Sequence, residues 1–237
     1  MAQKNVRTPY QHLFFDLDHT LWDMEKNSHL ALTKMYEFFA LKEKLGVTSA
    51  DFIGEYKFQN ERLWKEYRDH KVSKSELRKQ RFLRTLAKWD CADEMLALLL
   101  DETYLEESPR MPYLIAGARE LLEYLQQHYQ LHIITNGFKD ATALKLKYSN
   151  IQPFFKKVIT SDEYGANKPA AGIFVEAMKR AGAKRKHSIM IGDNLHTDIA
   201  GAQNCGLDQV YYNPGRQVHS AKVTFEVAEL REIQRFF

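Results

Sequence analysis

The chain has 237 residues, of which 44% are hydrophobic and 12% aromatic, so it can bury a sizeable core and is not disordered over most of its length. Its 34 Lys and Arg residues against 31 Asp and Glu residues give a net charge of +3, too weak to indicate a nucleic-acid polymer or a membrane surface as a partner. No apolar run approaches the roughly 20 residues of a membrane span, and the N-terminus lacks a signal-peptide core. We therefore expect a cytoplasmic protein.

The two cysteines, Cys91 and Cys205, lie far apart in the chain and form no C-x-x-C pair. This usage argues against a disulfide scaffold and against a structural zinc site. We expect two reduced, buried thiols.

The first expected element is a short apolar strand over residues 12–15, followed by a long stretch without proline. In that stretch, apolar residues recur every three or four positions, as on the buried faces of helices. These residues are Leu32, Met35, Tyr36, Phe39, Ile53, Tyr56, Leu63, Trp64, Tyr67, Phe82, Leu83, Leu86, Trp89, Leu96, Leu99 and Leu100. Two closely spaced prolines then interrupt the pattern. We predict a helical domain over residues 23–110, inserted into a core domain of residues 1–22 and 111–237.

Strands and helices alternate in the rest of the chain. The expected strands cover residues 131–134, 157–160, 187–191 and 209–212, and the expected helices cover residues 116–127, 141–148, 170–181 and 197–204. After a short alternating run, residues 226–237 have a helix-like pattern. Such alternation predicts an α/β fold, a Rossmann-like three-layer core with a central parallel sheet, to which the helical domain is added.

Polar residues follow the expected strands at their carboxyl ends, where open parallel sheets bind ligands. In chain order, these residues are Asp16, Asp18, Thr20, Thr135, Asn136, Lys168, Asp193, Asn194 and Asp198. Each short segment is common by itself, because D-x-D, T-N-G and G-D-N occur in turns and Lys-Pro at helix starts. Their joint occurrence at one edge of a sheet predicts a site for an anion together with a hard cation.

The residue types at this edge suit phosphoryl transfer. The Asp16 carboxylate can attack phosphorus and form an acyl phosphate. Asp18, two residues further on, points to the same side of an extended chain and can exchange a proton with the leaving oxygen and with water. Mg²⁺ prefers oxygen ligands, which suits Asp16, Asp193 and a backbone carbonyl, and it offsets repulsion between the carboxylates. Thr135 and Lys168 can contact phosphate oxygens.

In their order and spacing, these residues resemble the motifs of the haloacid dehalogenase superfamily. The matching segments are Asp16-Leu17-Asp18-His19-Thr20, Thr135, Lys168, and Gly192-Asp193 with Asp198. The helical domain lies where that family inserts a helical cap. The resemblance is strongest to the pyrimidine-type 5′-nucleotidases, on Asp18-His19-Thr20-Leu21-Trp22, Thr135-Asn136-Gly137-Phe138 and Leu63-Trp64-Lys65-Glu66-Tyr67. His19 departs from the pattern, since glycine is commonest there, and so does Ala170-Ala171 after Pro169.

The resemblance implies a role for each matched residue. Asp16 would be the nucleophile and Asp18 the acid and base, and Thr135, the Asn136 amide and Lys168 would hold the phosphoryl group. Mg²⁺ would be held by Asp16, Asp193 and the carbonyl of Asp18. Three further residues would support the site through water or through a neighbouring ligand: Thr20, Asn194 and Asp198.

The substrate expectation rests on the helical domain, which must supply specificity. Its aromatic and amide side chains could stack on a base and read its edge, although each one taken singly is more often helix core. The candidates are Asn60, Trp64 and Tyr67 of that domain, together with Trp22, which directly precedes it. With the resemblance, they predict hydrolysis of nucleoside 5′-monophosphates, pyrimidines preferred, by a monomer or weak oligomer. The alternatives are a sugar-phosphate or other small-metabolite phosphatase, or a phosphomutase. Asp18 argues against a dehalogenase, and the chain length against a phospho-acceptor receiver domain.

Overall fold

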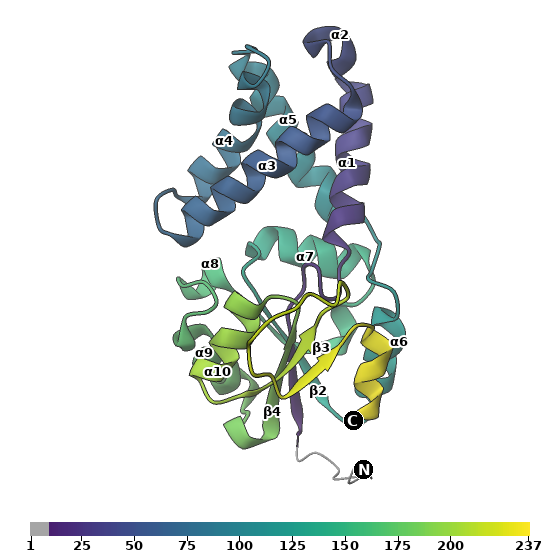
Figure 1. Cartoon of the computed structure of the whole chain (residues 1–237), viewed down its shortest axis with the longest axis vertical. Coiled ribbons are helices and arrows are strands. Elements are labelled where there is room, and N and C mark those ends of the chain that lie inside the picture. Colours follow the sequence, from purple (N-terminus) through teal and green to yellow (C-terminus); the bar gives the residue numbers. More distant parts are fainter. Residues whose placement is uncertain (1–9) are drawn as a thin grey trace. The chain divides into compact units, whose positions relative to one another are not determined.

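The computed structural model describes residues 10–237, which form two compact units (Figure 1). The core unit runs up to Met24 and resumes over Pro112–Phe237, and the helical unit is Glu25–Met111. The first nine residues of the predicted core domain lie outside the described residues.

A parallel sheet forms the centre of the core unit, as predicted. Its strands are β1 (His12–Phe15), β2 (Gln130–Thr135), β3 (Phe155–Thr160), β4 (Ser188–Gly192), β5 (Asp208–Tyr212) and β6 (Phe225–Val227). The strand order is β3-β2-β1-β4-β5-β6, and every neighbouring pair is parallel. The first strand of the chain therefore lies between two later ones.

Helices lie on both sides of this sheet, which completes the predicted three-layer α/β fold (Figure 1). They are α6 (Ala118–Leu125), α7 (Lys139–Tyr148), α8 (Ser161–Tyr164), α9 (Ala171–Ala181) and α10 (Ala200–Asn204). Phe14 of β1 packs in one buried cluster with Phe174 of α9 and Ala202 of α10. Its neighbours Leu13 and Phe15 point to the opposite face and are also fully buried. Burial on both faces explains why the last three residues of this strand are all apolar.

The register of the strands brings their carboxyl ends to one edge. Phe15, the last residue of β1, pairs with Ile133 of β2 and with Ile191 of β4. The backbone N–H of Asp16 donates to the carbonyl of Ile191 at 2.9 Å. Residues that follow these three strands are therefore held close together by main-chain hydrogen bonds.

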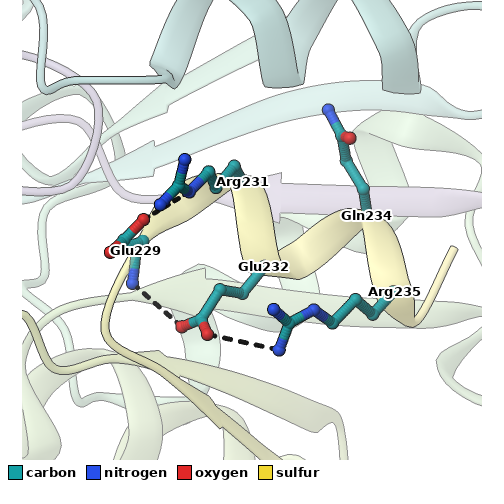
Figure 2. Close-up of a pocket in the computed structure, with 5 residues that line it drawn as sticks. All are labelled: Glu229, Arg231, Glu232, Gln234 and Arg235. Carbon is teal, nitrogen blue, oxygen red and sulfur yellow. Dashed lines mark hydrogen bonds and ion pairs between the residues drawn. The ribbon is translucent and has the colours of Figure 1, made fainter.

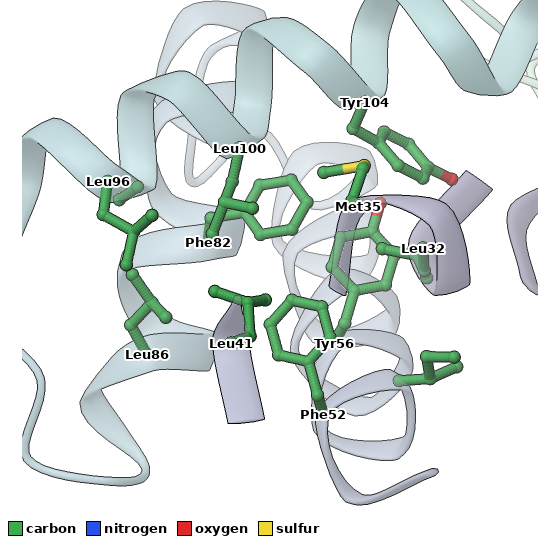
Figure 3. Packing of buried hydrophobic residues seen from close by; sticks show 12 residues of the cluster. Leu32, Met35, Leu41, Phe52, Tyr56, Phe82, Leu86, Leu96, Leu100 and Tyr104 are labelled. Carbon is green, nitrogen blue, oxygen red and sulfur yellow. The ribbon is translucent and has the colours of Figure 1, made fainter. Parts of the chain in front are cut away.

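The helical unit is built from α1 (Met24–Phe38), α2 (Leu41–Leu45), α3 (Ser49–Arg68), α4 (Lys74–Ala87) and α5 (Glu94–Glu107). Capping boxes begin two of these helices, Thr48 with Asp51 at α3 and Ser73 with Glu76 at α4. The apolar stripes meet in one buried cluster whose members include Phe52, Tyr56, Phe82, Leu86, Leu96, Leu100 and Tyr104 (Figure 3). Within the described part of the chain, no helix is both long and apolar enough to cross a membrane.

Two expected helices differ from the structure. The helix expected over residues 226–237 is wrong at its start, because Phe225–Val227 forms the edge strand β6, and only Leu230–Arg235 is helical, as a 3-10 helix. Phe225 and Val227 alternate with Glu226, and this period of two suits pairing with β5. The helix expected over residues 197–204 begins instead as a π-helical turn, Leu195–Ile199, before α10.

The cysteines also differ from expectation in one respect. Cys91 and Cys205 are both free, but each is partly exposed rather than buried. Cys205 packs against the buried cluster that contains Phe14, and its thiol donates to the carbonyl of Ala171 at 3.3 Å.

Candidate active site

Three acidic side chains meet at the carboxyl ends of β1 and β4. Asp16 directly follows β1, Asp193 directly follows β4, and Asp198 lies in the π-helical turn after it. One carboxylate oxygen from each lies within 4.8 Å of the others. Asp16 and Asp198 are buried, with 7% and 1% of their surface exposed. A cluster of carboxylate oxygens is the donor set that Mg²⁺ prefers, so these residues fit such an ion.

Lys168 is the cation that neutralises part of this cluster. Its ammonium group donates to Asp16 Oδ1 at 2.5 Å, to Asp198 Oδ1 at 2.6 Å and to the carbonyl of Ile134 at 2.8 Å. All three N–H donors therefore have protein acceptors. The structure places Lys168 between the nucleophile candidate and Asp198, and its expected contact with phosphate stays a prediction.

Burial and charge perturb the ionisation of these groups. Burial raises the pKa of Asp16 well above its usual value, and the nearby Asp198 and Asp193 act in the same direction against Lys168. Burial, followed by the charge of Asp198, raises the pKa of Asp193 to about 6. Burial opposes the charged form of Lys168, yet Asp16 and Asp198 outweigh it and raise the pKa of that ammonium. Burial is the largest cause for both acids and the neighbouring carboxylates add to it, so a divalent cation would favour the charged forms that burial opposes.

Thr20 and Gly192 position the two acids of the β4 end. The Thr20 hydroxyl donates to Asp193 Oδ1 at 2.8 Å, which leaves the second oxygen of that carboxylate available. A Cβ on Gly192 would lie 2.4 Å from Asp198 Oδ2, so only glycine lets Asp198 pack against the strand end. The same Asp198 oxygen accepts the backbone N–H of Asn194 at 3.1 Å. The Asn194 side chain caps the π-helical turn that carries Asp198.

Asn136 joins the β2 end to the loop that carries Lys168. Its side-chain oxygen accepts the Lys168 backbone N–H at 2.7 Å, and its side-chain nitrogen donates to the Lys168 carbonyl at 3.1 Å. The hydroxyl of the adjacent Thr135 accepts the Gly137 N–H at 3.0 Å. This use of the Asn136 side chain was not expected from the sequence, which suggested only its backbone amide as a phosphate donor.

Asp18 takes part in a different ion pair. Its carboxylate is not one of the three clustered acids, and its Oδ1 accepts a hydrogen bond from Lys145 Nζ of α7 at 2.6 Å. Sequence reasoning missed Lys145. Its signal was a lysine on the same helical face as Thr142 and Ser149, which are both buried.

The four residues expected to read the substrate have different surroundings. Trp22 is fully buried in the core unit beneath Lys145, whose Nζ lies 4.4 Å from the ring centroid, so the expectation that Trp22 faces a substrate is not supported. Asn60, Trp64 and Tyr67 lie on successive turns of one face of α3 in the helical unit. The rings of Trp64 and Tyr67 meet edge-on with centroids 5.7 Å apart.

A surface pocket near the C-terminus is separate from these residues. It is lined by Glu229, Arg231, Glu232, Gln234 and Arg235 (Figure 2). Its charges are paired among themselves, Arg231 with Glu229 and Arg235 with Glu232, and the Glu232 carboxylate also accepts the Glu229 backbone N–H at 3.1 Å. Such paired rim charges leave little to recognise a phosphate, and we assign the pocket no ligand.

Comparison with known proteins agrees with this geometry. The family model of haloacid dehalogenase-like hydrolases matches residues 13–211. YfnB of Bacillus subtilis, named as a HAD-hydrolase, is 31% identical over 227 residues and 94% of each chain. Its crystal structure, described as bound to magnesium, superposes with a TM-score of 0.84 at 30% identity, covering 95% of this chain and 97% of that one.

Two further relatives carry named activities. The pyrimidine 5′-nucleotidase PynA of Streptococcus pneumoniae is 33% identical over 230 residues, which cover 94% of this chain and 93% of PynA. A glyceraldehyde 3-phosphate phosphatase of Pyrococcus abyssi is 34% identical over 206 residues, which cover 86% of this chain and 82% of that protein. With a family match over most of its length and the acidic cluster at its strand ends, the chain belongs to the haloacid dehalogenase-like hydrolases.

Proposed function

We propose that the protein is a Mg²⁺-dependent phosphomonoester hydrolase that works through an aspartyl phosphate on Asp16. The observation that carries this proposal is the cluster of Asp16, Asp193 and Asp198 around Lys168 at the carboxyl ends of the strands. Three acids against one lysine leave an excess of negative charge. An anionic substrate can approach such a site only together with a cation.

Each candidate residue then has a defined task. An oxygen of Asp16 forms a bond to phosphorus while the ester P–O bond breaks, and Asp18 gives its proton to the leaving oxygen. A water molecule next attacks the phosphorus of the aspartyl phosphate, Asp18 takes up its proton, and phosphate and free Asp16 result. Thr135, the Asn136 backbone N–H and Lys168 would hold the non-bridging oxygens during both steps.

The metal would be held by Asp16, Asp193 and the carbonyl of Asp18. Bound Mg²⁺ would supply positive charge that lets the phosphate and the carboxylates come together. Asp198 supports the site indirectly, because its carboxylate fixes Lys168 and accepts the Asn194 N–H. Thr20 supports it by orienting Asp193.

For the substrate, we propose nucleoside 5′-monophosphates, with pyrimidines preferred over purines. The relative PynA supports this choice because it is named a pyrimidine 5′-nucleotidase and aligns with nearly the whole chain. Asn60, Trp64 and Tyr67 support it further, since one helix face presents two aromatic rings and an amide, groups that can stack on a base and bond to its edge.

The second candidate is a phosphatase of sugar phosphates or other small metabolites, and the Pyrococcus abyssi relative favours it. The decisive experiment is phosphate release with Mg²⁺ from a panel that contains uridine, thymidine and adenosine monophosphates, glyceraldehyde 3-phosphate and glucose 6-phosphate. We expect the highest kcat/KM for a pyrimidine nucleotide. A sugar or triose phosphate that exceeds it by about tenfold, or about 1.4 kcal/mol of transition-state preference, would reject the nucleotidase and keep the phosphatase.

A further inference from the structure

The ion pair between Asp18 and Lys145 joins two distant parts of the core unit. Asp18 follows β1, whereas Lys145 lies in the middle of α7, and the Nζ-to-Oδ1 distance is 2.6 Å. The side chains of Lys145 and Asp18 are only 9% and 25% exposed. The pair is therefore shielded from water on the lysine side, unlike the exposed ion pairs that contribute little to a fold.

Lys145 is itself held in place. Its ammonium group lies 4.4 Å from the centroid of the fully buried Trp22 ring, a favourable cation–π arrangement. Its backbone carbonyl accepts a hydrogen bond at 2.5 Å from the hydroxyl of Ser149, the residue that caps the C-terminus of α7. A cation fixed by a buried ring and a helix can define where the Asp18 carboxylate points.

The two oxygens of Asp18 are thereby made different. Oδ1 is engaged by Lys145, while Oδ2 lies beside the turn that follows β2. A Cβ on Gly137 would be 3.6 Å from Asp18 Oδ2 and 3.2 Å from the hydroxyl oxygen of Thr135. Oδ2 is thus the oxygen on the side of the residues proposed to hold the phosphoryl group.

We propose that Lys145 is a positioning residue, which holds Oδ1 of Asp18 so that Oδ2 exchanges the proton. The inference rests on the proposed function and deepens it. When the bond between Asp16 and phosphorus forms and the ester bond breaks, the proton on Oδ2 moves to the leaving oxygen. When water attacks the aspartyl phosphate, its proton returns to the same oxygen. Lys145 touches neither the substrate nor the metal in this scheme.

This role has a consequence that a purely structural ion pair lacks. An alkoxide needs a proton as it leaves, whereas p-nitrophenolate is a weak base and leaves without one. The value of kcat/KM reports only the steps up to departure of the leaving group. Loss of Lys145 should therefore harm alkyl esters more than p-nitrophenyl phosphate, while a loss of folding or of metal binding would harm both alike.

The test compares kcat/KM for p-nitrophenyl phosphate with that for the alkyl phosphate that ranks first in the substrate panel. We expect Lys145→Met to lower the alkyl-ester value by about tenfold more than the p-nitrophenyl value. Lys145→Arg keeps a donor and a charge and should recover the ratio to within about threefold of the unmodified protein. Lys147→Met, which removes the same charge from an exposed position of the same helix, should leave the ratio unchanged.

Controls separate the possible failures. Thermal unfolding should show a folded protein and calorimetric Mg²⁺ titration should match that of the unmodified protein, and Lys145→Gln replaces Lys145→Met if the methionine variant does not fold. In the Asp18→Asn background, adding Lys145→Met should cause no further loss, because both substitutions act on one proton transfer. If Lys145→Met lowers kcat/KM equally for the two esters, or if Lys145→Arg does not restore the ratio, the proposed role of Lys145 is overturned and the proposed function is not. Failure of the unmodified protein to hydrolyse either ester overturns the proposed function as well.

Discussion

Each of the two units buries an ion cluster, and the two clusters differ in charge balance. In the helical unit, Nε and Nη2 of Arg81 donate to Asp101 Oδ1 at 2.9 and 2.7 Å, and the guanidinium lies 4.9 Å from the Tyr104 ring. In the core unit, one lysine, Lys168, faces the three acids of the strand-end cluster. All members of the two clusters are buried except Asp193, which is partly buried, so burial does not distinguish them.

Charge balance does distinguish them. One cation and one anion inside an apolar cluster neutralise each other without a ligand, and this pair joins α4 to α5. One cation cannot neutralise three anions, so that cluster needs further positive charge. The pKa of Asp193 is raised to about 6, first by burial and then by the charge of Asp198. A buried ion cluster is therefore evidence for a functional site only when its positive and negative charges do not balance.

The largest effect on this comparison is expected from Asp16→Asn. The amide is nearly isosteric and can still accept from Lys168, but it cannot attack phosphorus. We expect the rate of phosphate release with Mg²⁺ to fall by about 1,000-fold or more while thermal unfolding shows a folded protein. Turnover above a trace in this variant would remove Asp16 from the role of nucleophile.

The next pair of variants separates metal binding from proton transfer. Asp18→Asn keeps the backbone carbonyl proposed to hold Mg²⁺ and should abolish nearly all turnover while Mg²⁺ still binds. Asp193→Asn removes a carboxylate from the acidic cluster and should weaken Mg²⁺ binding in calorimetric titration. Equal loss of Mg²⁺ affinity in both variants would contradict the division of roles between Asp18 and Asp193.

Substitutions in the Arg81–Asp101 pair should change the stability of the helical unit rather than the reaction rate. Arg81→Met leaves Asp101 buried without its partner and should lower the free energy of unfolding of the helical unit by about 3–5 kcal/mol, measured by urea denaturation. The double variant with Asp101→Leu should recover most of that loss, because no charge is then left buried. A single variant as stable as the unmodified protein would show that the pair contributes nothing to the helical unit.

A smaller effect is expected from a buried pair that carries no charge. His12 Nδ1 and His132 Nε2 lie 3.1 Å apart on β1 and β2, and burial, followed by the charges of His12 and Lys157, lowers the pKa of His132 to about 4. The unfolded chain, with a histidine pKa near 6.5, takes up this proton first. The stability contributed by neutral His132 is therefore present above about pH 6.5 and is lost as the pH falls towards 4.

His132→Phe checks this effect. Between pH 7.5 and pH 5, the unmodified protein should lose about 2 kcal/mol more unfolding free energy than the variant, because only the unmodified protein has this linked proton. Urea midpoints at the two pH values measure the difference. Equal losses in the unmodified protein and in His132→Phe would mean that His132 is not held neutral by its burial.

Several features of the molecule follow from local pattern and could be predicted. β1 is a short apolar run that stops directly before an acid. The position of Asp16 at the end of a strand was therefore evident from the local sequence. The helical spacing of apolar residues such as Phe82 and Leu86 also predicted that these side chains are buried. The C-terminal segment misled the prediction, because a three-residue edge strand such as Phe225–Val227 is too short to outweigh a helical pattern. His19, the departure from the family pattern, adopts φ 65°, a left-handed conformation that glycine adopts at no steric cost.

The sequence by itself determined the order of the strand-end residues and the residue types at each end, because a parallel sheet turns order along the chain into adjacency in space. Tertiary structure alone decided which partner each of these residues has. Lys145 reaches Asp18, the Asn136 side chain holds the Lys168 backbone, and Trp22 lies fully buried under a lysine. These contacts join residues tens to more than a hundred positions apart, or depend on which face of a helix meets the sheet. Periodicity describes one element at a time, so only the packing of elements against one another can fix them.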